Sequence, residues 1–510
     1  MKWLNAVIKT GFNLNLRHVQ KSIEHPETTQ QKVFEQLIRQ SSKTEFGRQH
    51  DFASIASIQQ LQERVPIQSY EEIKPYIQQM MAGTPNILVP GKVSYFSRSS
   101  GTTSHKSKYI PVPYNNLKHC HLKGAHDAVS IWFHNYPQSK LFDASRAIIM
   151  GGEIGLFNSQ ASTYVGDVSA IMLKHLPFYA AYFLTPNIPT ALLPDWEEKI
   201  ERIAQVAVHQ NITNLSGVPT WTLVLLRRIL ELSGKSHLTE VFPNFELYAH
   251  GGVDFAPYRS QFEALFPGNN VQYRNTYNAS EGFFATQFSE KDNGMQVLLD
   301  NGVFYEFVPL QELHQECPKT YTIAEVQTGI NYALLISTNA GLWRYLIGDT
   351  VQFTSIYPHH IQITGRTKQF INVFGEEVMV WNAEKALART CQQTQAQIAE
   401  YTVAPIFLSD DNKGGHEWLI EFEKLPNNIL QFKQLLDQNL QQLNSDYEAK
   451  RYKNIALQEL ELKVAPKGTF HNWLRSKGKY GGQNKVPRLS NQRQYLEEIL
   501  TFIPSEFSSF

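Results

Sequence analysis

A glycine-containing run of hydroxyl residues is the first stretch of this sequence that could hold a ligand. Residues 99–103 read Ser-Ser-Gly-Thr-Thr, after strand-like residues 93–96, and Lys108 follows shortly afterwards. Glycine lets the backbone approach a ligand closely, and successive N–H groups with several hydroxyls can bind an anion. The run therefore predicts a phosphate cradle to which the lysine adds positive charge. The alternative is an ordinary Ser/Thr turn, and the spacing of a Walker loop is absent.

A glutamate beside a glycine is the second candidate. Residues 277–282 read Tyr-Asn-Ala-Ser-Glu-Gly, after a predicted strand at 271–275. Hard carboxylate oxygens suit Mg²⁺, and phosphates can fill the other coordination positions, so Glu281 could hold this ion. Tyr277 could stack on a purine face. The alternative for this segment is the capped start of a helix.

Two further segments each contribute one charged residue. Asp349 ends the run Gly-Leu-Trp-Arg-Tyr-Leu-Ile-Gly-Asp, directly before a predicted strand at 350–355. A carboxylate in such a place can accept hydrogen bonds from both ribose hydroxyls. Lys485 lies in the basic, glycine-rich segment 477–488, which suits a mobile lysine delivered to a phosphate. The alternatives are a turn aspartate beside a glycine and a solvated basic loop.

The histidines around residue 120 do not predict a metal centre. His119 and His121 would point to different faces of a helix, and no second pair of ligands is obvious. Zinc sites need four ligands, or three and a water, in a paired spacing. We therefore expect no zinc here.

The elements that position these residues follow from hydrophobic periodicity. Helical spacing dominates the first hundred residues. From residue 147 strands alternate with helices, which argues for a mostly parallel sheet covered by helices. The predicted strands lie at 147–150 and 245–249 and the predicted helices at 221–232, with Thr220 as N-cap, and at 258–266. Strands at 303–308, 320–326, 332–338 and 350–355 predict an antiparallel β-rich subdomain. A hairpin at 403–408 and 417–423, a helix at 432–443, a strand at 457–464 and two final helices predict a small α+β domain.

Composition sets limits on the class of protein. The chain has 510 residues, a length typical of two or three domains. Hydrophobic residues make up 42% of the chain. Lys and Arg together number 47, as do Asp and Glu, so the net charge of zero argues against a dedicated nucleic-acid binder. The three cysteines, Cys120, Cys317 and Cys391, are too few for a disulfide framework and predict a cytoplasmic protein. No membrane span is expected, because no run of about 18 apolar residues is free of charge.

Taken in order, the four segments resemble the adenylate-forming enzymes, and within them the Gretchen Hagen family of acyl-acid amido synthetases. The resemblance covers essentially the whole chain. Its most specific part is the run 341–349, which matches at every fixed position, and the carboxy-terminal Gln-x-Lys-x-Pro-Arg matches at 483–488. Ser104 replaces a glycine of the wider superfamily, and the terminal Pro-Lys-x-x-x-G-Lys signature is absent. Both departures favour the amido-synthetase branch over acyl-CoA ligases.

The resemblance implies an α/β fold with an α+β carboxy-terminal domain. The large adenylate-forming domain would span 1–364, with mixed parallel sheets and a β-rich subdomain. A hinge would follow at 365–370, then a small mobile domain at 371–510 that carries a catalytic lysine loop. Residues 365–368 resemble the hinge motif of the superfamily.

The implied activity is an ATP- and Mg²⁺-dependent ligase that adenylates a carboxylic acid and transfers the acyl group to an amine, expected to be an amino acid. Lys485 and Glu281 would be catalytic, and Glu281 would hold the metal ion. The implied nucleotide-binding residues are Ser99, Ser100, Gly101, Thr102, Thr103, Lys108, Gly251, Gly252, Val253, Tyr277, Asn278, Ser280, Asp349, Arg366 and Gln483.

Partners are expected to be small molecules, with no nucleic acid and no membrane, and the protein is expected to be a monomer. Two alternatives stay open at this point. One is an acyl-CoA ligase with the same first step. The other is a non-catalytic protein that binds an acid or a nucleotide, although it would have no need of Glu281, Asp349 and Lys485 together.

Overall fold

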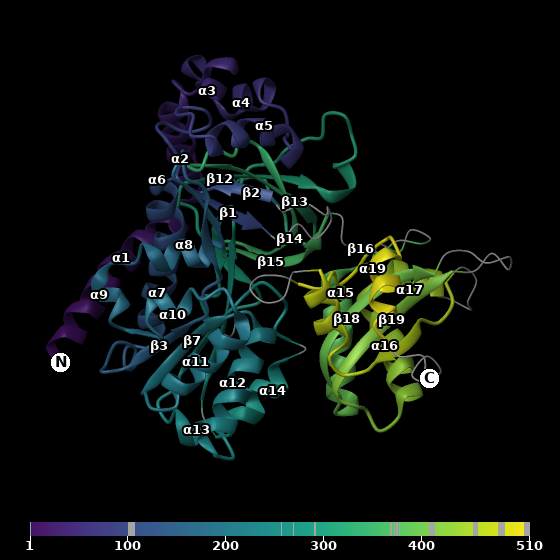
Figure 1. Ribbon diagram of the computed structural model, residues 1–510. Coiled ribbons are helices and arrows are strands. Elements are labelled where there is room, and N and C mark those ends of the chain that lie inside the picture. Colours follow the sequence, from purple (N-terminus) through teal and green to yellow (C-terminus); the bar gives the residue numbers. More distant parts are fainter. Residues whose placement is uncertain are drawn as a thin grey trace. The chain divides into compact units, whose positions relative to one another are not determined.

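The computed structural model describes residues 2–99, 108–256, 258–268, 270–289, 292–367, 370–371, 373, 376, 378–406, 414–451, 457–477 and 485–503. The described chain divides into two compact units. Of the described residues, the first contains those up to 99, 108–252 and 266–362, and the second contains those of 253–265 and from 363 onward. Figure 1 shows the elements of both units.

Amino-terminal helices open the first unit, as the periodicity predicts. They are α1 (Lys2–Glu24), α2 (Pro26–Ser41), α3 (Glu45–Gln49), α4 (Ile58–Arg64) and α5 (Tyr70–Met81). Thr44 and Ser57 cap α3 and α4 by accepting a backbone N–H, as short polar side chains do at helix starts. The buried side chain of Gln30 donates to the backbone oxygens of Leu299 and Val303 and so ties α2 to the main sheet. None of the described helices is both long and apolar enough to cross a membrane.

The later helices of this unit alternate with strands. They are α6 (Tyr114–Asn116), a π-helical turn (Leu117–Leu122), α7 (Lys123–Asn135), α8 (Val168–Lys174), α9 (Phe178–Ala181), α10 (Ile188–Ala191), α11 (Trp196–Ala207), α12 (Pro219–Ser233) and α13 (Leu238–Val241). The predicted N-cap of α12 at Thr220 is wrong. The helix begins at Pro219 with Val218 before it, because the fixed φ of proline suits the first helical position.

An eleven-stranded sheet forms the centre of the first unit, in the order β12-β13-β14-β15-β11-β10-β9-β8-β7-β3-β6. Its strands are β3 (Arg146–Ile149), β6 (Leu184–Thr185), β7 (Ile212–Gly217), β8 (Leu247–His250), β9 (Gln272–Ala279), β10 (Gly282–Thr286), β11 (Met295–Val297), β12 (Val303–Pro309), β13 (Asn331–Thr338), β14 (Tyr345–Ile356) and β15 (His359–Arg366). The strands β6, β3, β7, β8 and β9 are parallel, whereas β9 pairs antiparallel with β10. The expected α/β class is therefore confirmed, and β9 is the strand at which the parallel part meets the antiparallel part.

A second sheet in this unit has the order β2-β1-β5-β4. Its strands are β1 (Tyr95–Ser99), β2 (Lys108–Pro111), β4 (Ile154–Asn158) and β5 (Thr163–Gly166). One predicted strand is absent from the described structure, because residues 320–326 contribute only an isolated bridge between Tyr321 and Phe307.

The second unit is an α+β structure, as predicted. Strands β18 (Gln397–Ile406) and β19 (Gly415–Lys424) pair antiparallel, and β20 (Glu461–Ala465) runs parallel to β19. Trp418 and Ile420 of β19 lie in one hydrophobic cluster and Leu419 in another, so helices cover both faces of this sheet. The other elements are α14 (Arg259–Leu265), β16 (Phe370–Ile371), β17 (Val378–Met379), α15 (Val380–Thr394), α16 (Ile429–Leu443), α17 (Ser445–Arg451), α18 (Thr469–Ser476) and α19 (Gln494–Leu500).

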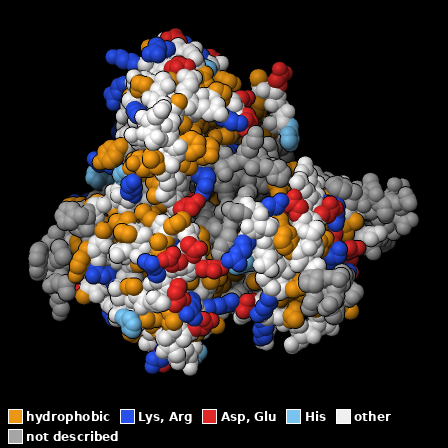
Figure 2. All heavy atoms as spheres, viewed as in Figure 1, with side chains coloured by type: hydrophobic (Ala, Val, Ile, Leu, Met, Phe, Trp, Pro, Cys, Tyr) orange, Lys and Arg blue, Asp and Glu red, His pale blue; other side chains and the backbone are white. Residues whose placement is uncertain are grey.

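The charged surface mixes both signs. On the face that Figure 2 shows, Lys and Arg side chains lie among Asp and Glu side chains, as expected for a chain with equal numbers of each.

Candidate functional site

The segment 277–281 lies on the hairpin formed by β9 and β10, and three of its side chains each contact a different element. The Tyr277 hydroxyl donates to Asp349 Oδ2 of β14 at 2.6 Å. Asn278 Oδ1 lies 3.3 Å from His121 Nδ1 of the π-helical turn. Ser280 Oγ lies 2.9 Å from Ser97 Oγ of β1. The hairpin is therefore the place where the predicted second and third segments meet, next to the strand that leads into the first.

Glu281 occupies the turn of this hairpin and is buried, with 6% of its surface exposed. The alternative of a capped helix start is wrong, because β9 continues through Ala279 and pairs with β10 directly after the turn. Mg²⁺ is commonly held by one or two carboxylates together with substrate phosphates. Among the described residues no group of three His, Cys, Asp or Glu side chains could hold an ion. A single buried carboxylate could therefore supply one ligand to Mg²⁺ that the phosphates of a substrate also hold.

Asp349 lies within β14, which begins at Tyr345 and not at residue 350 as predicted. Its side chain is half-buried, and Tyr277 occupies one of its oxygens. The ring of Tyr277 is itself buried and packs edge-on against Phe284 with centroids 4.9 Å apart. A stacking role for this ring on a purine stays a prediction.

Ser99 and Lys108 face each other across the β1–β2 hairpin, because they are partners in its register. Lys108 Nζ lies 3.4 Å from the Tyr345 hydroxyl, with Nζ 5.6 Å from the ring centroid of Tyr70 and 5.9 Å from that of Tyr345. Aromatic faces attract a cation at such distances, so they hold the ammonium group at the base of the predicted cradle. The remaining cradle residues, Ser100, Gly101, Thr102 and Thr103, lie outside the described residues, as does Gln483.

The glycine pair after β8 lies against the same hairpin. Thr276 Oγ1 donates to the backbone oxygen of His250 at 3.0 Å. A Cβ atom at Gly251 would lie 2.4 Å from the backbone oxygen of Thr276, and Gly252 has a φ of 85°. Both positions therefore require glycine, which brings this turn close to Tyr277.

The other predicted residues, Val253, Arg366 and Lys485, belong to the second unit. Within it Arg488 is buried, pairs with Glu400 and donates to the Tyr258 hydroxyl at 3.0 Å. Burial and then the charge of Asp254 raise the pKa of the neighbouring Glu384, and Arg488 and Lys485 oppose the shift, which leaves this pKa at about 8. Sequence reasoning missed this acidic pair, because neither residue stands in a recognisable motif.

Arg344, which lies in the run 341–349, has a structural role that the motif does not indicate. The residue is buried with a left-handed φ of 42°. Its guanidinium pairs with Glu306 at 3.1 Å and donates to the backbone oxygens of Gln62 and Val65 at the end of α4. It therefore joins the amino-terminal helices to the strands that carry Asp349.

Comparison with known proteins covers nearly the whole chain. Family models match residues 15–271 (GH3 family N-terminal domain), 296–366 (GH3 family central domain) and 381–494 (GH3 family C-terminal domain). The indole-3-acetic acid-amido synthetase GH3.3 of Arabidopsis thaliana is 21% identical over 93% of this chain and 91% of that protein. The indole-3-acetic acid-amido synthetase GH3.8 of Oryza sativa subsp. indica is also 21% identical, over 95% of this chain and 91% of that protein.

Solved structures show the same fold. The GH3.15 acyl acid amido synthetase matches with a TM-score of 0.77 at 16% identity, covering 96% of both chains. A 2-hydroxyisobutyryl-CoA ligase in the postadenylation state, in complex with 2-HIB-AMP, matches with a TM-score of 0.57 at 10% identity, over 93% of this chain and 91% of that one. The fold of this chain is thus the fold of an acyl acid amido synthetase and of a CoA ligase.

Proposed function

This chain belongs to the GH3 family, and on that premise we propose that it is an ATP-dependent acyl-acid amido synthetase. The observation that carries the proposal is the hairpin of β9 and β10. Its Tyr277 contacts Asp349 of β14, its Ser280 contacts β1, which ends at Ser99, and Glu281 lies in its turn. These are the residues that the resemblance assigns to the nucleotide and the metal ion.

The proposed reaction has two half-reactions. A carboxylate oxygen of the acid attacks the α-phosphorus of ATP, the bond to the β-phosphate oxygen breaks, and pyrophosphate leaves. The amine nitrogen then attacks the acyl carbon, the bond from that carbon to AMP breaks, and the amine loses a proton. Such phosphoryl chemistry depends on positioning and charge stabilisation more than on covalent help from the protein.

The residues of the first unit have separate parts in this proposal. Asp349 accepts hydrogen bonds from the ribose hydroxyls through its carboxylate oxygens, which also accept from Tyr277. Ser99 and Lys108 stand at the two ends of the loop that would hold the phosphates, while Glu281 would hold Mg²⁺, which neutralises phosphate charge when bound. The buried position of Glu281 supports this, because a carboxylate in a low-dielectric surrounding gains from a cation.

The second unit is proposed to supply Lys485. Its ammonium would stabilise charge on the α-phosphate and the acyl oxygen during adenylation. Rotation about residues 365–370 would then open the site to the amine. Two of the three cysteine thiols are buried and all are free, which supports a reducing, cytoplasmic compartment, and we propose that a single chain suffices for activity.

The substrates are proposed by class. The named plant relatives carry indole-3-acetic acid in their names, and one GH3.15 structure holds 2,4-DB. We therefore propose a small carboxylic acid as the acyl donor and an amino acid as the acceptor.

Acid-dependent release of pyrophosphate tests the first half-reaction. Purified protein with ATP and Mg²⁺ is assayed across a panel of small carboxylic acids, and then across amino acids and coenzyme A with mass detection of products. We expect pyrophosphate only when a suitable acid is present, and an amide as the product. A thioester would make the protein an acyl-CoA ligase. ATP binding without pyrophosphate release for any acid would make it a binding protein.

A further inference from the structure

We propose that His121 is a positioning residue. It fixes the side-chain amide of Asn278 in one orientation and so decides which hydrogen-bonding groups the β9–β10 hairpin offers to the substrate. This inference rests on the proposed function, because it gives Asn278 a part in binding. His121 lies on the π-helical turn between α6 and α7 and is fully buried.

The π-helical turn presents two consecutive side chains to the same hairpin. Cys120 Sγ accepts the backbone N–H of Phe283 at 3.4 Å, and His121 Nδ1 contacts Asn278 Oδ1 at 3.3 Å. Neighbouring residues of a regular α-helix do not share a face, whereas a π turn widens the helix and is frequent at functional sites. The local irregularity is therefore what brings the histidine to the hairpin.

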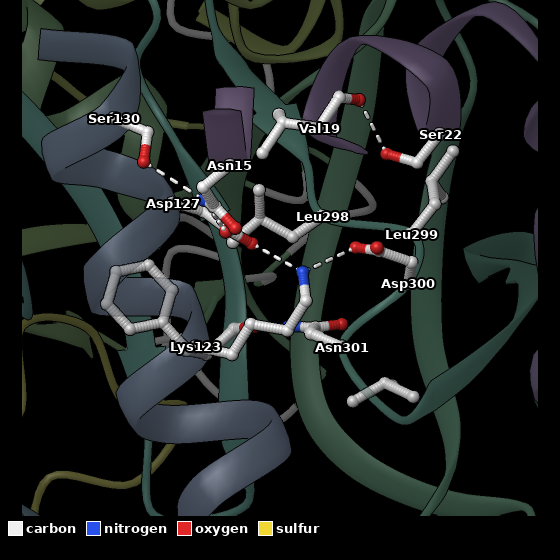
Figure 3. Close-up of polar contacts among 12 residues, drawn as sticks. Asn15, Val19, Ser22, Lys123, Asp127, Ser130, Leu298, Leu299, Asp300 and Asn301 are labelled. Atoms are coloured by element: carbon white, nitrogen blue, oxygen red, sulfur yellow. Dashed lines mark hydrogen bonds and ion pairs between the residues drawn. The ribbon is translucent and has the colours of Figure 1, made fainter. Parts of the chain in front are cut away.

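Two glycines and an ion-pair network hold this helix against the hairpin. A Cβ atom at Gly124 would lie 2.5 Å from Cγ of Phe283, and one at Gly282 would lie 3.1 Å from Cys120 Sγ. Behind them Lys123 Nζ lies between Asp127 at 2.7 Å and Asp300 at 2.8 Å, as Figure 3 shows. The position of the His121 ring is thus set by close packing. It is also set by the ion pairs of Lys123, one of which reaches Asp300 in the connection between β11 and β12.

The charge and tautomer of His121 follow from its surroundings. Burial lowers its pKa to about 4, so the ring is neutral near pH 7 and carries one N–H and one lone pair. Asn278 Oδ1 is an acceptor, so Nδ1 is assigned the hydrogen. The other nitrogen, Nε2, is buried and carries the lone pair, with no hydrogen-bond partner among the described residues.

The Asn278 amide then has one favourable orientation. Its Oδ1 accepts from His121, and its Nδ2 lies 4.0 Å from Met172 Sδ, a weak acceptor. A reversed amide would donate to Nδ1 and move the ring hydrogen to Nε2, which is buried with no acceptor among the described residues, and it would set oxygen against sulfur at the methionine. Because Asn278 is only half-buried, one N–H and one lone pair of the oriented amide remain for a ligand. Without the histidine both orientations become accessible.

Three substitutions of His121 distinguish the proposed positioning role from a merely structural role. His121→Asn keeps an amide N–H at the place of Nδ1, His121→Gln moves it to the place of Nε2, and His121→Leu removes it. We expect His121→Asn to keep the wild-type KM for ATP within about twofold, and the other two variants to raise it by about 5- to 10-fold, as for one lost hydrogen bond. The melting temperatures of the Asn and Gln variants should agree. Equal KM values for these two variants would overturn the inference.

A double-mutant cycle tests whether the histidine acts through Asn278. In an Asn278→Ala background, His121→Gln should cause no further change in KM for ATP, because the amide that it orients is gone. Additive changes would show that His121 acts elsewhere. If the wild-type protein releases no pyrophosphate with any acid, the proposed function fails, and calorimetry of ATP binding on the same variants decides the positioning role independently. Equal affinities of His121→Asn and His121→Gln for ATP would refute the positioning role.

Discussion

Replacing Asp349 by asparagine is the most direct test of the nucleotide site, because the structure specifies what is lost. The Tyr277 hydroxyl already occupies Oδ2 of this carboxylate at 2.6 Å, a distance typical of a charge-assisted O–H···O⁻ bond. An ionised carboxylate has about four lone-pair sites on two oxygens, so a carboxylate can accept from a tyrosine and from ribose hydroxyls together. Asparagine offers two lone pairs on one oxygen, and Tyr277 would take one of them.

The expected loss is therefore one hydrogen bond to a charged acceptor. Such a bond contributes about 1.5–3 kcal/mol, which corresponds to a roughly 10- to 150-fold weaker affinity for ATP. Tyr277→Phe is the matched control, since it removes the donor but keeps both carboxylate oxygens. It should cost only about 2- to 10-fold, because water can replace the hydroxyl at a half-exposed carboxylate.

Calorimetric titration of ATP into the folded variants measures both effects. In the double variant Tyr277→Phe/Asp349→Asn, the lost hydroxyl frees the remaining amide lone pair, so the affinity should be no lower than for Asp349→Asn alone. Wild-type affinity in Asp349→Asn would refute the ribose assignment. Fully additive losses in the double variant would show that the two residues act on ATP separately.

Three further predictions concern the other charged groups. Glu281→Gln should raise the Mg²⁺ concentration needed for half-maximal pyrophosphate release, because a neutral amide is a poorer ligand for a hard dication, and an unaltered titration curve would leave the residue a structural part only. Lys485→Ala should slow acyl-adenylate formation by about 10²–10³-fold while ATP binding and amide formation from synthetic acyl-adenylate stay near the wild-type values, and equal loss of both half-reactions would contradict this division of labour. Burial raises the pKa of Glu384 from 4.5 to about 8, so the folded state holds a proton that the unfolded chain releases and stability falls as pH rises through this window. Urea unfolding of the full chain across that range should show a weaker decline for Glu384→Gln, and an identical decline would mean that the proton is held elsewhere.

The class of fold could be predicted because it depends on local patterns. Helical spacing in the first hundred residues and the alternation of strands and helices after residue 147 both appear in the structure. The predicted strand at 320–326 failed for a local reason as well. Thr322 donates from its backbone N–H and its hydroxyl to Glu325 at 2.8 Å, which closes a turn where β-branched residues suggested a strand.

The positions of motif residues within strands were harder to predict, because pairing partners decide them. β14 starts at Tyr345 since Tyr345 and Leu346 pair with Ile336 and Leu335 of β13, beyond a shift in register. The strand is preceded by two residues of positive φ, Gly341 and Arg344, which form the turn. Asp349 is consequently a residue inside a strand. Propensity alone placed it before one.

The part of the site that sequence reasoning missed rests on contacts between distant residues. His121 and Asn278 are 157 positions apart, and the histidine stands beside Cys120 in a segment that suggested at most a metal site. The contact of His121 with the hairpin depends on the π-helical turn, and no periodicity in the sequence predicts that turn. The raised pKa of Glu384 could not be predicted for the same reason, because its environment comes from elements far apart in the chain.

The hairpin of β9 and β10 explains why the order of residues in its motif matters. Successive side chains of a strand point to opposite faces, so Tyr277 and Asn278 leave β9 on different sides. One side meets Asp349 of the antiparallel strands, and the other meets the helix that carries His121. Because β9 is also where the parallel and antiparallel parts of the sheet join, a shift of one residue would exchange the two partners and break both contacts. The motif is thus constrained by the sheet as much as by the ligand it is proposed to hold.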